Sequence, residues 1–173
     1  MVSLTVLFWM YIILFAFIGT IRGWAKELLV TFGVILAIFI ITVLLPFIDG
    51  GFDPETLFWV RLIMLGLLVF FGYQTPNIRK LAESGIFIRE RLQDFVLGIF
   101  LGAINGFLFF GTAWFYLHEA GYPFDAIAAP DATTAAGQAA LNLINILPPN
   151  WLQVPAIYFA IAISFVFVLV VFI

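Results

Sequence analysis

The chain carries uncharged apolar runs that are too long for a soluble core. No charged residue precedes Arg22, and none stands between Glu27 and Asp49. A helix rises about 1.5 Å per residue, so roughly 20 apolar residues cross a hydrocarbon core about 30 Å thick. Backbone polar groups in lipid must be satisfied within the segment, which makes each such run a helix. The sequence therefore predicts an all-α integral membrane protein.

Composition supports this class and excludes several others. The chain is 65% hydrophobic and 10% charged, whereas soluble domains average about 45–50% and 25%. Cysteine is absent, which excludes disulfides, iron–sulfur clusters and thiolate zinc sites. No basic run indicates nucleic acid. The first apolar run lacks the basic start of a secretory signal, so we interpret it as a retained span.

Five segments are predicted to span the membrane, at about residues 4–21, 28–48, 56–74, 95–118 and 151–173. Apolar and basic residues alternate at helical spacing over 75–94, which predicts short amphipathic helices at the membrane interface, with a solvated loop as the alternative. Residues 119–150 hold four prolines and an alanine-rich middle. We expect one short interfacial or partly re-entrant helix there, within 131–147 and ended by Pro148 and Pro149.

Basic residues in short loops predict the orientation. Arg22 and Lys26 follow the first span, and four more follow the third: Arg79, Lys80, Arg89 and Arg91. The other two loops hold acidic residues and no Lys or Arg. We therefore expect an external N-terminus and a cytoplasmic C-terminus, with 75–94 cytoplasmic and 119–150 external. Arg22 and Lys26 then hold the first turn inside, or they dock a partner.

Small residues at helical spacing predict close helix packing. Gly98, Gly102 and Gly106 recur every four residues and share one face, with Asn105 beside them. Such seams let backbones approach, and a buried amide is expected to bond another helix. The last span repeats the pattern with Ala156, Ala160 and Ser164. These faces pack within the chain or against partner subunits, and a polar path past Asn105 is a third interpretation.

Two further polar features stand out near the expected outer surface. Arg61 is the only charge inside a predicted span, and it forms a candidate polar pair with Glu119 at similar depth; a substrate-facing Arg61 is the alternative. His118 is the only histidine, so this chain alone cannot build a multi-histidine metal site. We place His118 at the interface, or as a single ligand to a pigment or metal that a partner completes.

No constellation of residues indicates catalysis. The serines lie outside the spans or within the last one, so a triad with His118 is not expected. Nucleotide-binding and metalloprotease motifs are absent from the sequence. We predict no enzyme, no catalytic residue, no cofactor or metal site and no small-molecule substrate.

Residues 19–28 read Gly-Thr-Ile-Arg-Gly-Trp-Ala-Lys-Glu-Leu. This stretch resembles the Gly-x-x-Arg-Gly-x-x-Lys-Glu-Leu signature of the CvpA family, the colicin V production proteins, and the matching motif residues are Gly19, Arg22, Gly23, Lys26 and Glu27. A second match begins at Asp94 and continues through the glycine seam, although Phe95 replaces the family's usual arginine. The resemblance covers about residues 4–117.

The CvpA resemblance implies a multi-pass protein of the bacterial inner membrane, associated with colicin V secretion and envelope homeostasis. It carries no catalytic residue onto this chain. Two functions are therefore expected. One is an accessory or scaffolding subunit that packs against other integral membrane proteins in a secretion, respiratory or photosynthetic complex. The other is a transport or channel component, for which the available polar lining is thin: Asn105, Thr112, Thr42 and Arg61.

Overall fold

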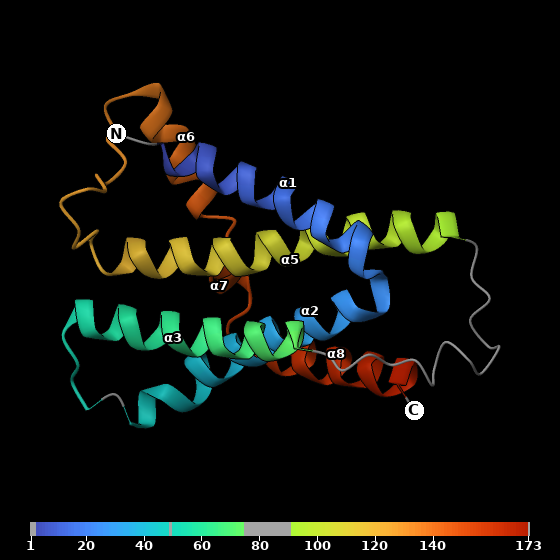
Figure 1. Cartoon of the computed structure of the whole chain (residues 1–173). Coiled ribbons are helices and arrows are strands. Elements are labelled where there is room, and N and C mark those ends of the chain that lie inside the picture. Colours follow the sequence, from blue (N-terminus) through green and yellow to red (C-terminus); the bar gives the residue numbers. More distant parts are fainter. Residues whose placement is uncertain (1–2, 49, 75–90, 173) are drawn as a thin grey trace.

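The computed structural model describes residues 3–48, 50–74 and 91–172, and the regular elements in these ranges are all helices. Four are long and apolar enough to cross a membrane, as expected for a membrane protein. They are α1 (Leu4–Arg22), α2 (Trp24–Phe39) with its continuation to Phe47, α3 (Pro54–Tyr73) and α5 (Arg91–Glu119). They lie side by side, with α1 and α3 running opposite to α2 and α5 (Figure 1).

The turn between α1 and α2 is a single residue, Gly23. Its φ of 81° is accessible to glycine at little cost, and α2 restarts at Trp24. The expected longer turn is therefore wrong, and the helix begins four residues before the second predicted span. Lys26 and Glu27 belong to α2, not to a loop. Beyond Phe39, α2 continues as a π-helical stretch (Ile40–Leu44) and a 3₁₀ turn (Leu45–Phe47).

The glycine seam of α5 packs against α1. A Cβ atom on Gly98 or Gly102 would collide with the backbone carbonyl of Gly19 or Phe15, and one on Gly106 would lie 2.9 Å from the Ile12 Cα. Side chains at these positions would hold the two backbones apart. The predicted close approach is therefore present, and it joins two helices of the same chain.

Asp53 caps the start of α3. Asp53 accepts hydrogen bonds from the Thr56 hydroxyl at 2.7 Å and from the Thr56 amide at 3.0 Å. These bonds lower the pKa of the Asp53 carboxyl. Pro54 occupies the first turn of the helix, where its missing N–H has no intrahelical partner to lose.

The segment after α5 differs in detail from its prediction. Helix α6 (Ala135–Ile144) is shorter than 131–147 and is capped by Thr134, whose hydroxyl accepts from the Gly137 amide at 3.0 Å. Pro148 and Pro149 do not simply end it, because they open a further short helix, α7 (Pro148–Trp151). Pro148 packs on α5 at Gly111, where a Cβ would lie 2.9 Å from the proline Cδ.

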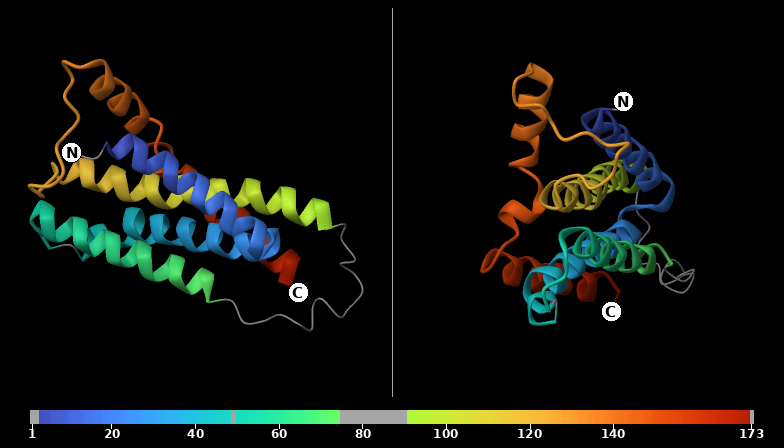
Figure 2. Two further views of the ribbon diagram at one scale, coloured as in Figure 1. Left: turned by 45° about the horizontal axis from the view of Figure 1, so that its top comes forward. Right: turned by 90° about the vertical axis from the view of Figure 1, so that its left-hand side faces the viewer.

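The last apolar helix, α8 (Ala156–Phe172), has 17 residues and packs mainly against α2 (Figure 2). It does not begin at residue 151, because α7 ends there and a non-helical link with Pro155 follows. Proline disfavours helical backbone in the residue before it. Ala156 is exposed, and Ala160 and Ser164 are partly buried. The small-residue seam of this helix therefore stays a prediction, since it would pack against a partner subunit at Ala156.

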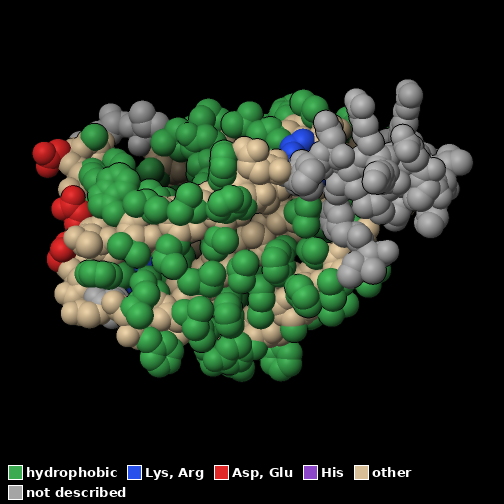
Figure 3. Space-filling model, turned by 60° about the horizontal axis from the view of Figure 1, so that its bottom comes forward, with side chains coloured by type: hydrophobic (Ala, Val, Ile, Leu, Met, Phe, Trp, Pro, Cys, Tyr) green, Lys and Arg blue, Asp and Glu red, His purple; other side chains and the backbone are tan. Residues whose placement is uncertain are grey.

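Residues 75–90, which hold most of the predicted interfacial segment, lie outside the described residues. Residues 91–94 belong to the first turn of α5. At the opposite end of the bundle the surface is acidic (Figure 3). We call the end with Asp53 and Glu119 the Glu119 end, and the end where α1 meets α2 the Arg22 end.

Substituting Gly102 by Ala should separate α1 from α5. Overpacking at such a contact costs about 1–3 kcal/mol, which lowers the thermal unfolding temperature of the purified protein. Gly66→Ala is the matched control, because a Cβ at Gly66 has nothing within 4 Å. That control should be neutral or slightly stabilising, by up to about 1 kcal/mol. Equal melting temperatures for the two variants would contradict the seam.

Candidate functional site

A buried ion pair lies where α1 meets α2. The Arg22 Nη1 donates to Glu27 Oε1 at 2.8 Å, and the Glu27 side chain is 0% exposed. Removing a carboxylate from water costs several kcal/mol unless partners compensate it. Arg22 is in the last turn of α1 and Glu27 in the first turn of α2. Each charge therefore also faces the favourable end of its helix dipole.

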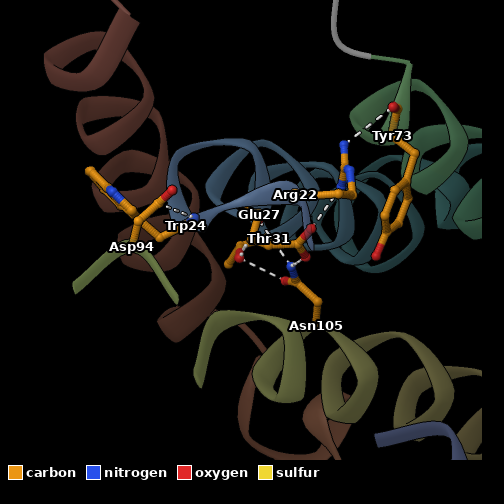
Figure 4. A network of polar contacts seen from close by, with 7 residues as sticks. All are labelled: Arg22, Trp24, Glu27, Thr31, Tyr73, Asp94 and Asn105. Carbon is orange, nitrogen blue, oxygen red and sulfur yellow. Dashed lines mark hydrogen bonds and ion pairs between the residues drawn. The ribbon is translucent and has the colours of Figure 1, made fainter. Parts of the chain in front are cut away.

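Helix α5 supplies the second partner of Glu27. The Asn105 amide donates to Glu27 Oε2 at 2.8 Å and to the Glu27 carbonyl at 3.0 Å. The Thr31 hydroxyl, one turn further along α2, donates to Asn105 Oδ1 at 2.7 Å. The expected bond from Asn105 to another helix is thus present. Both carboxylate oxygens of Glu27 are engaged (Figure 4).

Helix α3 joins the same cluster through Tyr73. Arg22 Nη2 donates to the Tyr73 carbonyl at 3.2 Å, and the guanidinium carbon lies 4.1 Å from the centre of the tyrosine ring. The carbonyl belongs to the last turn of α3, where helix carbonyls lack intrahelical donors. Arg22 therefore donates to a free carbonyl at the end of α3 in addition to the Glu27 carboxylate.

Asp94 of α5 binds the start of α2 from the side. Its carboxylate accepts from the Trp24 amide at 3.2 Å. A Cβ on Gly23 would lie 2.9 Å from both Asp94 oxygens, so glycine is needed for this approach as well as for its φ. A carboxylate at a helix N-terminus is stabilised by the free amides and the dipole.

These contacts form a cluster that we call the Arg22 cluster, which joins α1, α2, α3 and α5 and comprises Arg22, Trp24, Glu27, Thr31, Tyr73, Asp94 and Asn105 (Figure 4). Its charges bond to one another and to helix ends. The arrangement holds helices in register. It contains no nucleophile paired with a base, which acyl-transfer or hydrolytic chemistry would require.

A second polar group lies at the Glu119 end. Arg61 Nη1 and Glu119 Oε2 are 2.6 Å apart, so the predicted pair is present. The guanidinium carbon of Arg61 also lies 4.8 Å from the ring centre of Tyr116. Glu119 is 45% exposed, and such a pair is worth less than a buried one.

His118 lies beside this second group and packs its ring against Tyr122, with centroids 5.7 Å apart. Tyr122 in turn accepts a hydrogen bond from Trp114 Nε1 at 3.3 Å. Burial raises the pKa of the Tyr122 hydroxyl. Within the described ranges, no group of three or more His, Cys, Asp or Glu residues could hold a metal ion.

Sequence reasoning placed some of these residues correctly and missed others. Glu27 was expected outside the spans, yet it is buried in α2. Arg22 was expected to mark the cytoplasmic surface, yet it is bonded inside the bundle. Thr31 was not singled out, although its position one turn after Glu27 was a signal. Tyr73 contributes a backbone carbonyl, which side-chain patterns cannot reveal.

Comparison with known proteins adds no relative. No protein-family model, curated protein or solved structure matches the chain. The resemblance to CvpA therefore stays a prediction based on its two short motifs.

A double-mutant cycle on Arg22 and Glu27 should expose the cost of an unpaired buried charge. Glu27→Leu alone leaves the Arg22 guanidinium without a carboxylate partner and should destabilise the protein by about 3–5 kcal/mol. Arg22→Met combined with Glu27→Leu should recover a large part of that loss. Thermal unfolding of the purified variants in detergent measures both.

The matched control for this cycle is the more exposed pair Arg61 and Glu119. The same kind of cycle there should give a coupling of about 1 kcal/mol or less. Equal coupling energies for the two pairs would contradict the structural role assigned to the Arg22 cluster.

Proposed function

We propose that this chain is a non-enzymatic, CvpA-like protein of the bacterial inner membrane. It acts as an accessory or scaffolding subunit that packs against other integral membrane proteins in a larger assembly. The observation that carries the proposal is that the polar groups of the Arg22 cluster bond to one another within the chain. Both oxygens of Glu27 and the Asn105 amide bond other helices, so these contacts hold the helices in a fixed arrangement.

The outer surface of the spans supports a packing role. Helix α8 packs mainly against α2, and its remaining sides expose large apolar residues. A shallow hollow on that outer side is lined by Ala162, Ile163, Val166, Phe167 and Val170. A small residue among bulky neighbours admits the side chain of another membrane helix.

The two motifs of the CvpA resemblance come together in space, which supports their relevance. Gly19 of the first motif packs on Gly98 of the second. Glu27 of the first bonds Asn105 of the second. The resemblance thus rests on residues that contact one another.

The proposed topology follows the basic residues, with the Arg22 end cytoplasmic and the Glu119 end external. Five crossings, the last made by α8, then place the C-terminus in the cytoplasm. A reporter that is active only in the cytoplasm, fused after Ile173, should be active. The same reporter inserted at the exposed Ala126 of the Glu119 end should be silent. The reverse pattern would overturn this orientation.

A transport or channel component is the second candidate, favoured by the burial of Glu27 inside the membrane domain. Ionisable residues within spans often mark ion pathways. The hollow between α1, α3 and α5 is lined by apolar side chains, among them Phe8, Phe58 and Phe110. This lining favours the scaffolding role.

Purification of the full chain from native membranes in a mild detergent tests that role. We expect a constant set of other membrane proteins to co-elute. Ala162→Trp fills the hollow on α8 and should release them without lowering the melting temperature. Phe100→Trp, on the exposed side of α5, is the control and should leave the assembly intact. A chain that always elutes alone would contradict the proposal.

A further inference from the structure

Helix α5 carries a line of polar residues along one face. At about 3.6 residues per turn, five positions share that face: Asp94, Asn105, Thr112, Tyr116 and Glu119. Asp94 and Asn105 belong to the Arg22 cluster. Glu119 is paired with Arg61. Thr112 and Tyr116 lie between these bonded groups.

Five buried polar side-chain atoms of the described residues lack a hydrogen-bond partner, Tyr73 Oη and His118 Nδ1 among them, and the other three belong to this region. They are Thr112 Oγ1, Tyr116 Oη and Arg61 Nε, and within the described ranges no donor or acceptor lies in hydrogen-bond reach of them. Thr112 is 0% exposed and Tyr116 is 4% exposed. A buried polar atom without a partner costs about 1–3 kcal/mol, so three together call for a ligand.

The three groups are related by one turn of α5 and by one contact between α3 and α5. Thr112 and Tyr116 are one turn apart, and a long side chain on a helix leans back over the preceding turn. The Tyr116 phenol therefore extends toward Thr112. Arg61 of α3 lies against the Tyr116 ring, 4.8 Å from its centre. Arg61 and Tyr116 thus meet where α3 packs on α5, and Thr112 lies one turn before Tyr116.

The chemistry of these groups specifies a small neutral ligand. Arg61 is already neutralised by Glu119 at 2.6 Å, so no net charge attracts an anion or a cation. The Thr112 and Tyr116 hydroxyls each donate and accept, while Arg61 Nε only donates. Water can donate to and accept from all of these groups, and buried waters in proteins make about three hydrogen bonds.

We propose that Thr112, Tyr116 and Arg61 line a small hydrated pocket between α3 and α5, whose ligand is water. It opens at Glu119, which is 45% exposed, and reaches roughly 10 Å into the bundle, the rise of α5 from Thr112 to Glu119. It ends where the same face of α5 presents the buried Leu108. The pocket is distinct from the Arg22 cluster and does not rest on the proposed scaffolding function.

Cysteine accessibility tests the pocket in a background that has no cysteine. Thr112→Cys is treated with a small cationic methanethiosulfonate reagent, with the protein in lipid nanodiscs so that both ends are reachable. Such reagents attack the thiolate, which forms only in water. Leu108→Cys is the matched control, one turn deeper on the same face. Ala126→Cys, in the exposed segment after α5, marks full reactivity.

We expect Thr112→Cys to be labelled at least about tenfold faster than Leu108→Cys. The thiol at position 112 can ionise in the hydrated pocket, whereas the thiol at position 108 is surrounded by apolar side chains. Intact-protein mass spectrometry measures both rates. Labelling of the two variants at the same low rate would overturn the pocket.

The sign of a hydroxyl deletion provides a second measurement. If water bonds Thr112, Thr112→Val removes a hydrogen-bond partner of that water and should lower the melting temperature by about 2–4 °C. Thr112→Ser keeps the hydroxyl and should have a higher melting temperature than the valine variant. If the site is dry, valine removes an unsatisfied hydroxyl and the melting temperature rises. A melting temperature for Thr112→Val equal to or above that of the unmodified chain would refute hydration.

Discussion

The packing of this bundle depends on the Arg22–Glu27 ion pair at the junction of α1 and α2. A charge buried among membrane helices is tolerated only when its partners replace the water it has lost. Here the partners come from three directions: Arg22 from α1, Asn105 from α5, and the Tyr73 carbonyl from α3, which binds Arg22. Displacing any one of these helices would remove a hydrogen-bond partner from Arg22 or Glu27, so the pair favours one relative position of the helices.

The one-residue turn at Gly23 makes this pair geometrically accessible. Because α2 restarts at once, Glu27 lies in its first turn and faces back toward Arg22. The same glycine admits Asp94 of α5 to the start of α2. The backbone contact between Gly19 and Gly98 brings α5 close enough for both interactions. Steric and electrostatic constraints therefore meet at one end of the bundle.

The sequence predicted the parts of the fold that depend on apolar length and small-residue spacing. Four long apolar helices, the α1–α5 seam and the Arg61–Glu119 pair follow from such patterns. The burial of Glu27 could not be predicted, because a charged residue between apolar runs is equally typical of a loop. The start of α8 was missed for a related reason: hydropathy does not register the backbone break that separates α7 from Ala156.

Helix α5 links two polar regions that differ in how they are satisfied. Near Asn105 the partners are protein groups, and the helices are locked together. Near Thr112 and Tyr116 protein partners are lacking among the described residues, and water supplies them in the hydrated pocket that we propose. About two turns of α5, roughly 10 Å, separate the regions, and Leu108 is buried on that stretch. A continuous path would require this apolar packing to open. The physical cost of that opening favours a rigid packing subunit over a conduit.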